Sequence, residues 1–162
     1  ISAYLTQRKS ENDVYDSTFK TRDEFEKNLL TEKYDCIGIY VNLVTKLSVL
    51  KIIRFIRSKG ELKNTKIVLG GPDITYNIEN YLKQDIDFAV YGEGEETFYE
   101  LTELLKNNKP FGDCKGLACI ENGNVRINPE REKIKNIDEL PLPARDKIDL
   151  DKYVKIFIVD EI

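Results

Sequence analysis

The stretch K-I-V-L-G-G-P-D, residues 66–73, decides the fold of this chain. Its three consecutive apolar residues, two of them β-branched, predict a buried strand. The strand is predicted to end at Gly70-Gly71, because paired glycines allow positive φ and carry no Cβ to keep another molecule away. Pro72 cannot donate a ladder hydrogen bond and fixes the exit from the strand. Ligands bind at such strand ends in open α/β sheets, although an unliganded strand-to-helix turn has the same residues.

Strand and helix patterns alternate on both sides of this stretch. Nearly continuous apolar residues at 34–41 predict a second strand that is covered on both faces. Residues 88–91 predict a third strand. Helices are predicted up to Gly60, with Leu47 among the apolar positions, over 76–83, and from Glu95 onward. Alternation in units of about 30 residues is typical of parallel βαβ units. Right-handed crossovers then place the turns after the strands along one edge of the sheet.

The rhythm changes after Pro110. Residues 115–127 predict a β-hairpin on an Asn-Gly turn, and the charged residues that follow lead into a stiff, extended Leu-Pro-Leu-Pro stretch at 140–143. The predicted fold class is therefore α/β, a Rossmann-like (flavodoxin-like), doubly wound parallel sheet with helices on both faces. The predicted domains are the sheet at 1–112, an appended hairpin at 113–128 and a linker at 129–162.

Composition excludes several classes of protein. The 162 residues are 41% hydrophobic and 33% charged, which is typical of a globular protein and not of a disordered one. With a net charge of −4 and no basic block, the chain offers nucleic acid no obvious binding surface. No apolar run approaches the roughly 20 residues of a membrane helix, and we see no secretory signal, so a cytoplasmic location is expected.

Metal and redox chemistry have few candidate residues here. There is no histidine, which removes the commonest metal ligand and the commonest general base. The three cysteines, Cys36, Cys114 and Cys119, form no C-x-x-C pair, which argues against a disulfide framework and a local zinc site. No metal ligands and no catalytic residues are therefore predicted. Since the sequence starts at Ile1 and contains no methionine, we expect it to be a piece of a longer protein.

Taken in order, the motifs resemble the cobalamin-binding-type domain that precedes the radical SAM barrel in B12-type radical SAM enzymes. The resemblance spans nearly the whole chain, and its strength lies in the ordered set, since each motif alone is weak. The motifs are D-C-I-G-I-Y-V at 35–41, I-V-L-G-G-P-D-I-T at 67–75, F-A-V-Y-G-E-G-E-E-T-F-Y-E-L at 88–101, K-G-L-A-C-I-E-N-G-N-V at 115–125 and I-D-E-L-P-L-P-A-R-D at 137–146.

The resemblance implies a Rossmann-like sheet with cobalamin across its C-terminal edge. It also implies that this domain binds and orients the cofactor for a radical SAM Fe-S oxidoreductase or methyltransferase. The 4Fe-4S cluster and S-adenosylmethionine would then belong to a radical SAM domain beyond Ile162. The cofactor-binding residues implied by the matching motifs are Asn42, Leu43, Gly70, Gly71, Pro72, Asp73, Thr75, Tyr91, Gly92, Glu93 and Gly94.

Two departures from the family pattern matter. Asp73 stands where family members often carry histidine after G-G-P. The C-x3-C-x2-C cluster motif is absent from these residues, and the first strand, with the D-x-H-x-x-G loop of other cobalamin proteins, would precede Ile1. For Glu93 and Glu95, helix capping and pairing with the helix dipole are an alternative to ligand contact.

Three functions compete. The domain holds cobalamin, or it keeps the same fold without a cofactor as a scaffold or substrate-docking domain for the barrel. A third possibility is an unrelated flavodoxin-like module, such as a receiver or flavin carrier. The third is disfavoured because Tyr40-Val41-Asn42 supplies no strand-end aspartate and no hydroxyl-rich phosphate loop is present. Fold alone does not separate the first two.

Overall fold

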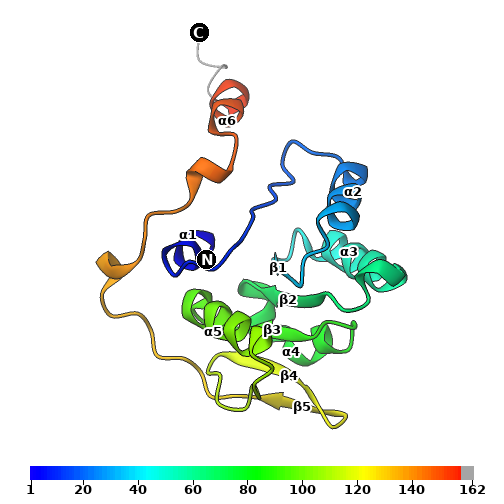
Figure 1. The fold of residues 1–162 in the computed structure, drawn as a ribbon, viewed down its shortest axis with the longest axis vertical. Coiled ribbons are helices and arrows are strands. Elements are labelled where there is room, and N and C mark those ends of the chain that lie inside the picture. Colours follow the sequence, from blue (N-terminus) through cyan, green and yellow to red (C-terminus); the bar gives the residue numbers. More distant parts are fainter. Residues whose placement is uncertain (158–162) are drawn as a thin grey trace.

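A computed structural model describes residues 1–157 and shows one five-stranded sheet with helices on both faces (Figure 1). The helices are α1 (Ser2–Gln7), α2 (Arg22–Glu32), α3 (Lys46–Ser58), α4 (Pro72–Leu82), α5 (Gly94–Lys106) and α6 (Leu150–Phe157). The strands are β1 (Cys36–Tyr40), β2 (Lys66–Gly70), β3 (Phe88–Val90), β4 (Leu117–Glu121) and β5 (Asn124–Ile127). Short 3-10 turns lie at Gly60–Leu62, Ile137–Glu139 and Arg145–Lys147.

The strands are arranged in the order β1-β2-β3-β4-β5. The first three are parallel, with Ile37 opposite Ile67 and Val68 opposite Phe88. The predicted hairpin is confirmed, but it is not a separate appendage: β4 pairs antiparallel with β3 and β5 with β4, so the hairpin continues the same sheet. The sheet is thus mixed, and its parallel part carries the predicted Rossmann-like architecture.

The two faces of the sheet are buried by different helices. Ile67 and Leu69 of β2 point into one core with residues of α2, α3 and α4, whereas Val68 packs with Leu101 of α5 on the opposite face. Side chains alternate between the faces of a strand. A strand covered on both sides must therefore be apolar at every position, which is why 67–69 is a continuous apolar run.

Local signals place most helix boundaries. At the start of α2 the Thr21 hydroxyl accepts a hydrogen bond from the Glu24 N–H, and the Glu24 carboxylate accepts one from the Thr21 N–H at 2.6 Å. The start predicted for the helix after β2 is wrong: α4 begins at Pro72, not at residue 76. Asn77 has non-helical backbone angles (φ −137°, ψ 24°) that bend α4, so the periodicity predicted only the part beyond the bend.

After β5 the chain runs up one side of the molecule, past α1, to α6 at the top of the view (Figure 1). The Lys147 ammonium donates to the Asn12 carbonyl oxygen at 2.7 Å, and the Tyr153 hydroxyl donates to Asp16 Oδ2 at 2.5 Å. The linker predicted at 129–162 includes residues 158–162, which lie outside the described residues, and the three domain boundaries remain predictions. In residues 1–157, none of the helices has both the length and the hydropathy of a membrane span.

Candidate functional site

The turns after β1, β2 and β3 lie along one edge of the sheet, because the three strands are parallel. Asn42 and Leu43 follow β1, Gly71 and Pro72 follow Gly70 at the end of β2, and residues 91–94 follow β3. The predicted site residues are therefore brought to the carboxyl edge of the sheet, where open α/β sheets bind ligands. The side chains at this edge differ in what they contact.

The two adjacent glycines at the end of β2, Gly70 and Gly71, differ in their surroundings. Gly71 has a φ of +116°, and a Cβ built on it would lie 2.4 Å from the Val41 carbonyl oxygen and 3.1 Å from the Tyr40 ring. The packing of the chain itself therefore requires Gly71. A Cβ on Gly70 would meet only the Val90 carbonyl oxygen, at 3.7 Å, which is ordinary contact. Among residues 1–157, no neighbour therefore demands glycine at position 70, and the position of a side chain there is unfilled.

Large apolar side chains are exposed around this edge. Five of them, from the end of β1, the following loop, the start of α3 and the first turns of α4, are between 65% and 91% exposed: Tyr40, Leu43, Val44, Leu47 and Tyr76. Leu47 is one of the apolar positions on which this helix was predicted, yet it is exposed, and α3 buries Val49, Ile53 and Ile56 instead. The prediction that residues 34–41 are covered on both faces is wrong at Tyr40, which ends β1 on the surface. Sequence analysis also missed Val44, in the loop, and Tyr76, in α4, as surface residues.

The loop after β1 is shaped by its own side chains. The Thr45 N–H donates to Asn42 Oδ1 at 2.9 Å, and the Asn42 N–H donates to the Thr45 hydroxyl at 3.0 Å. These reciprocal bonds form a turn of the kind that asparagine and threonine favour. The Asn42 side chain thus builds the loop, and the loop presents Leu43 to solvent.

Asp73 is bonded inward, to α3 and α4. Its carboxylate accepts a short hydrogen bond from the Tyr81 hydroxyl and one of 3.0 Å from the Asn77 amide, and the Lys46 ammonium lies 3.3 Å away. The hydrogen bond from Tyr81 and the charge of Lys46 lower the pKa of Asp73. Burial and the Asp73 carboxylate raise the pKa of Tyr81 above its usual value. Thr75, by contrast, is exposed in the same helix.

The turn after β3 is bonded to a later part of the chain. The Tyr91 hydroxyl donates a short hydrogen bond to the Asn128 carbonyl oxygen, and Glu93 Oε2 accepts from the Ile134 N–H at 2.6 Å. Gly92 has a φ of +72°, a conformation that side chains rarely adopt. The side chains of Tyr91 and Glu93 therefore hold residues 128–134, while the turn's backbone stays at the sheet edge.

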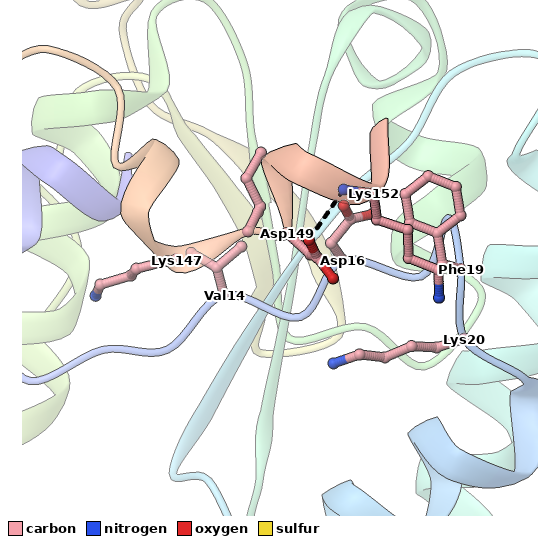
Figure 2. Close-up of a pocket in the computed structure, with 8 residues that line it drawn as sticks. Val14, Asp16, Phe19, Lys20, Lys147, Asp149 and Lys152 are labelled. Carbon is pink, nitrogen blue, oxygen red and sulfur yellow. Dashed lines mark hydrogen bonds between the residues drawn. The ribbon is translucent and has the colours of Figure 1, made fainter. Parts of the chain in front are cut away.

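Two cavities lie elsewhere than at the Gly70-Gly71 turn. The first, about 130 Å³, is enclosed by residues 14–20 and 147–152 (Figure 2). It is smaller than the roughly 300 Å³ at which small-molecule pockets begin. The second, about 450 Å³, lies between α1, the start of α5 and residues 132–140. Neither is bordered by Gly70 or Gly71, so the candidate site is the open edge of the sheet and not one of these cavities.

The three cysteines are free. Burial raises the pKa of the Cys36 and Cys114 thiols to about 12, so both are protonated at neutral pH. Within residues 1–157 no three Cys, Asp or Glu side chains are grouped so that they could hold a metal ion. The edge instead combines open backbone at Gly70 with exposed aromatic and aliphatic side chains. This combination suits a large organic ligand with an apolar surface.

Comparisons with known proteins identify relatives of this chain. It is 35% identical over 121 residues to an uncharacterized methyltransferase of Pyrococcus horikoshii, covering 74% of this chain and 26% of the relative. An uncharacterized protein of Methanocaldococcus jannaschii is 29% identical over 133 residues, covering 81% and 25%. The chain thus spans about a quarter of the length of the curated relatives that it matches.

Solved structures share the fold. The cobalamin-dependent S-adenosylmethionine radical enzyme OxsB, with aqua-cobalamin bound, superimposes with a TM-score of 0.80 and 26% identity over 90% of this chain and 21% of that chain. The radical S-adenosylmethionine methyltransferase TsrM of Kitasatospora setae, with cobalamin and a 4Fe-4S cluster, gives a TM-score of 0.67 at 19% identity over 86% and 27%, which shows the fold alone. The family model described as the B12 binding domain matches residues 1–102. The chain therefore belongs to the B12-binding domain family.

Proposed function

We propose that this domain binds cobalamin along the carboxyl edge of β1, β2 and β3, as one part of a longer cobalamin-dependent radical SAM protein. The observation that carries the proposal is the open space at Gly70, in a member of the B12-binding family, beside exposed apolar side chains. Burying those side chains under a corrin would remove apolar surface from water, which is favourable. The radical SAM domain, its 4Fe-4S cluster, S-adenosylmethionine, methyltransferase-type activity and a cytoplasmic location belong to this proposal for the whole protein.

The residues of this chain would bind and orient the cofactor. Gly70 lets the ligand approach the backbone, and Leu43, Val44 and Tyr40 supply apolar surface. Asp73 and Asn42 would act indirectly, by fixing the loops on either side of the glycine turn. Cobalamin, when bound, supplies the methyl-transfer or redox chemistry, and the protein supplies binding and orientation.

One observation favours the second function, a scaffold without cofactor. The side chains of Asp73, Tyr91 and Glu93 each make a hydrogen bond within the chain, so each has a structural role that needs no ligand. On this alternative the exposed apolar edge would pack directly against the radical SAM domain.

A titration of the full-length protein with hydroxocobalamin, followed by its visible spectrum, separates the two functions. The informative variant is Gly70→Ala, which the chain itself accommodates but which fills the space at the proposed cofactor. Its control is Gly60→Ala, where a Cβ meets nothing within 4 Å and which lies beyond the opposite end of β2. We expect binding by the wild type and the control, and affinity weakened by about tenfold or more in Gly70→Ala. A wild type that binds no cobalamin supports the scaffold.

A further inference from the structure

The segment after β5 is built into the turn that follows β3. The Gly116 N–H donates to the Pro129 carbonyl oxygen at 2.8 Å, and the Tyr91 N–H donates to the Gly116 carbonyl oxygen at 3.0 Å. The Tyr91 hydroxyl reaches the Asn128 carbonyl oxygen as well. A Cβ on Gly116 would lie 2.8 Å from the Thr97 hydroxyl and 3.1 Å from the Tyr91 carbonyl oxygen. Gly116 is therefore bonded to both the segment and the turn, and the packing around it leaves no room for a side chain.

Arg131 fastens this segment to the start of α5. Its Nε donates to the Thr97 hydroxyl at 2.8 Å, Nη1 lies 3.2 Å from Glu96 Oε1, and Nη2 donates to Glu100. Nη2 also lies 3.3 Å from the Lys115 carbonyl oxygen. The Arg131 side chain is only 12% exposed, so its hydrogen bonds are shielded from competing water. A guanidinium can serve several acceptors in fixed directions, and Arg131 does so here.

Glu93 holds the segment at a second point. Its carboxylate accepts the Ile134 N–H at 2.6 Å, a charge-assisted bond of the stronger kind. Glu93 is also the residue immediately before α5, and its side chain makes no capping bond to that helix. Between Arg131 and Ile134 the segment is therefore held at two points, one on the first turns of α5 and one on the turn after β3.

We propose that Glu93 and Arg131 act as positioning residues. Through them, residues 128–134 fix the backbone of the turn at 91–94, so that cobalamin affinity depends on this segment. This inference rests on the proposed function. It also assigns the side chains of the turn a role other than direct contact with the ligand. They transmit the position of residues 128–134 to the sheet edge. Coupling of this kind is reciprocal, so cobalamin binding must stabilise the segment as much as the segment stabilises cobalamin binding.

The test uses the full-length protein, hydroxocobalamin and two variants that carry the same change of charge. Arg131→Gln removes the anchor to α5, whereas Lys133→Gln, two residues away, alters an exposed side chain. We expect Arg131→Gln to weaken cobalamin binding by about tenfold, a typical coupling between sites, and Lys133→Gln to bind as the wild type does. Arg131→Lys keeps the charge but not the planar fork, so it should fall between the two.

Hydrogen exchange supplies a readout that a purely structural role would not change. In the wild type, cobalamin should slow exchange in a peptide covering residues 130–136, which contains the Ile134 amide, and in Arg131→Gln this protection should be smaller. If the wild type binds cobalamin but exchange at 130–136 is unchanged and Arg131→Gln binds normally, the proposal is wrong. If Arg131→Gln does not fold, the wild-type exchange result decides. Absence of cobalamin binding by the wild type refutes the proposed function, and this inference with it.

Discussion

Gly71 and Val41 are packed so closely that a Cβ on Gly71 would lie 2.4 Å from the Val41 carbonyl oxygen. The contact joins the turn after β2 to the end of β1. Val41 itself is fully buried, and its N–H donates to the Gly70 carbonyl oxygen at 2.8 Å. The relative position of the two strand ends at the candidate site is therefore set by glycine, before any ligand is considered.

This relationship predicts that Gly71→Val destabilises the domain without cobalamin. The variant combines a steric conflict with the backbone and a β-branched residue at a φ of +116°, so we expect a loss of about 2 kcal/mol or more in the free energy of unfolding. Urea unfolding of the cofactor-free protein measures it. If the variant had the same free energy of unfolding as the wild type, the close packing at Gly71 would not be required for stability. Loss of cobalamin binding in Gly71→Val is consequently not evidence for a clash with the corrin, whereas loss in Gly70→Ala is.

The hydrogen bond between Asp73 and Tyr81 predicts that the free energy of unfolding depends on pH. Asp73 has a lowered pKa in the folded protein, first because of the Tyr81 hydroxyl, and an ordinary pKa of about 3.9 when unfolded. The unfolded chain therefore binds more protons in this range, so stability rises with pH. The stability that Asp73 contributes is complete above its pKa in the unfolded state, and it is lost as the pH falls through its pKa in the folded state.

Tyr81→Phe removes the largest cause of that lowered pKa while keeping the buried ring. We expect the variant to lose less stability than the wild type between pH 5 and pH 3, measured by urea unfolding at both values. Tyr76→Phe is the control, because Tyr76 is exposed in the same helix. Equal losses in Tyr81→Phe and the wild type would show that this hydrogen bond does not perturb Asp73.

Asp87 joins three donors at the amino end of β2. It accepts from the Arg57 guanidinium at 2.5 Å, the Lys66 ammonium at 3.1 Å and the Ile67 N–H at 2.8 Å. Asp87→Ala leaves the half-buried guanidinium of Arg57 and the N–H of Ile67 without this acceptor. The free energy of unfolding should fall by about 1–3 kcal/mol. Thermal or urea unfolding measures the loss, and Glu61→Ala, at an exposed site, should change it little.

The capping box of α2 predicts a smaller loss of stability than the change at Asp87. Thr21→Ala removes the oxygen that accepts the Glu24 N–H, and such caps contribute about 1 kcal/mol. Thr21→Ser retains the oxygen and should retain the stability. If alanine and serine at this position gave the same unfolding midpoint, the cap would not stabilise the domain.

Periodicity predicted the elements whose pattern is local. The run at 67–69, apolar at every position, was sufficient for β2 because that strand is buried on both faces, and Asn122-Gly123 was sufficient for the hairpin because few other dipeptides form its turn. Periodicity failed at α4, because an apolar pattern does not show that the backbone angles of Asn77 break the helix. It also did not show that Leu47 is exposed, since the sequence gives the residue type and not the direction of the side chain.

The sequence by itself determined the α/β fold, the family resemblance and the sheet edge that carries the candidate site. Strand spacing and parallel order bring the turns at residues 42, 71 and 92 together whatever their side chains do. Only the tertiary structure decided which of those residues are available. There is room for a side chain at Gly70, whereas at Gly71 a Cβ would collide with the Val41 carbonyl oxygen. Glu93 is bonded to Ile134, 41 positions further along the chain. The physical reason is that hydrogen bonds and close packing join residues distant in sequence, and no local pattern encodes those pairings.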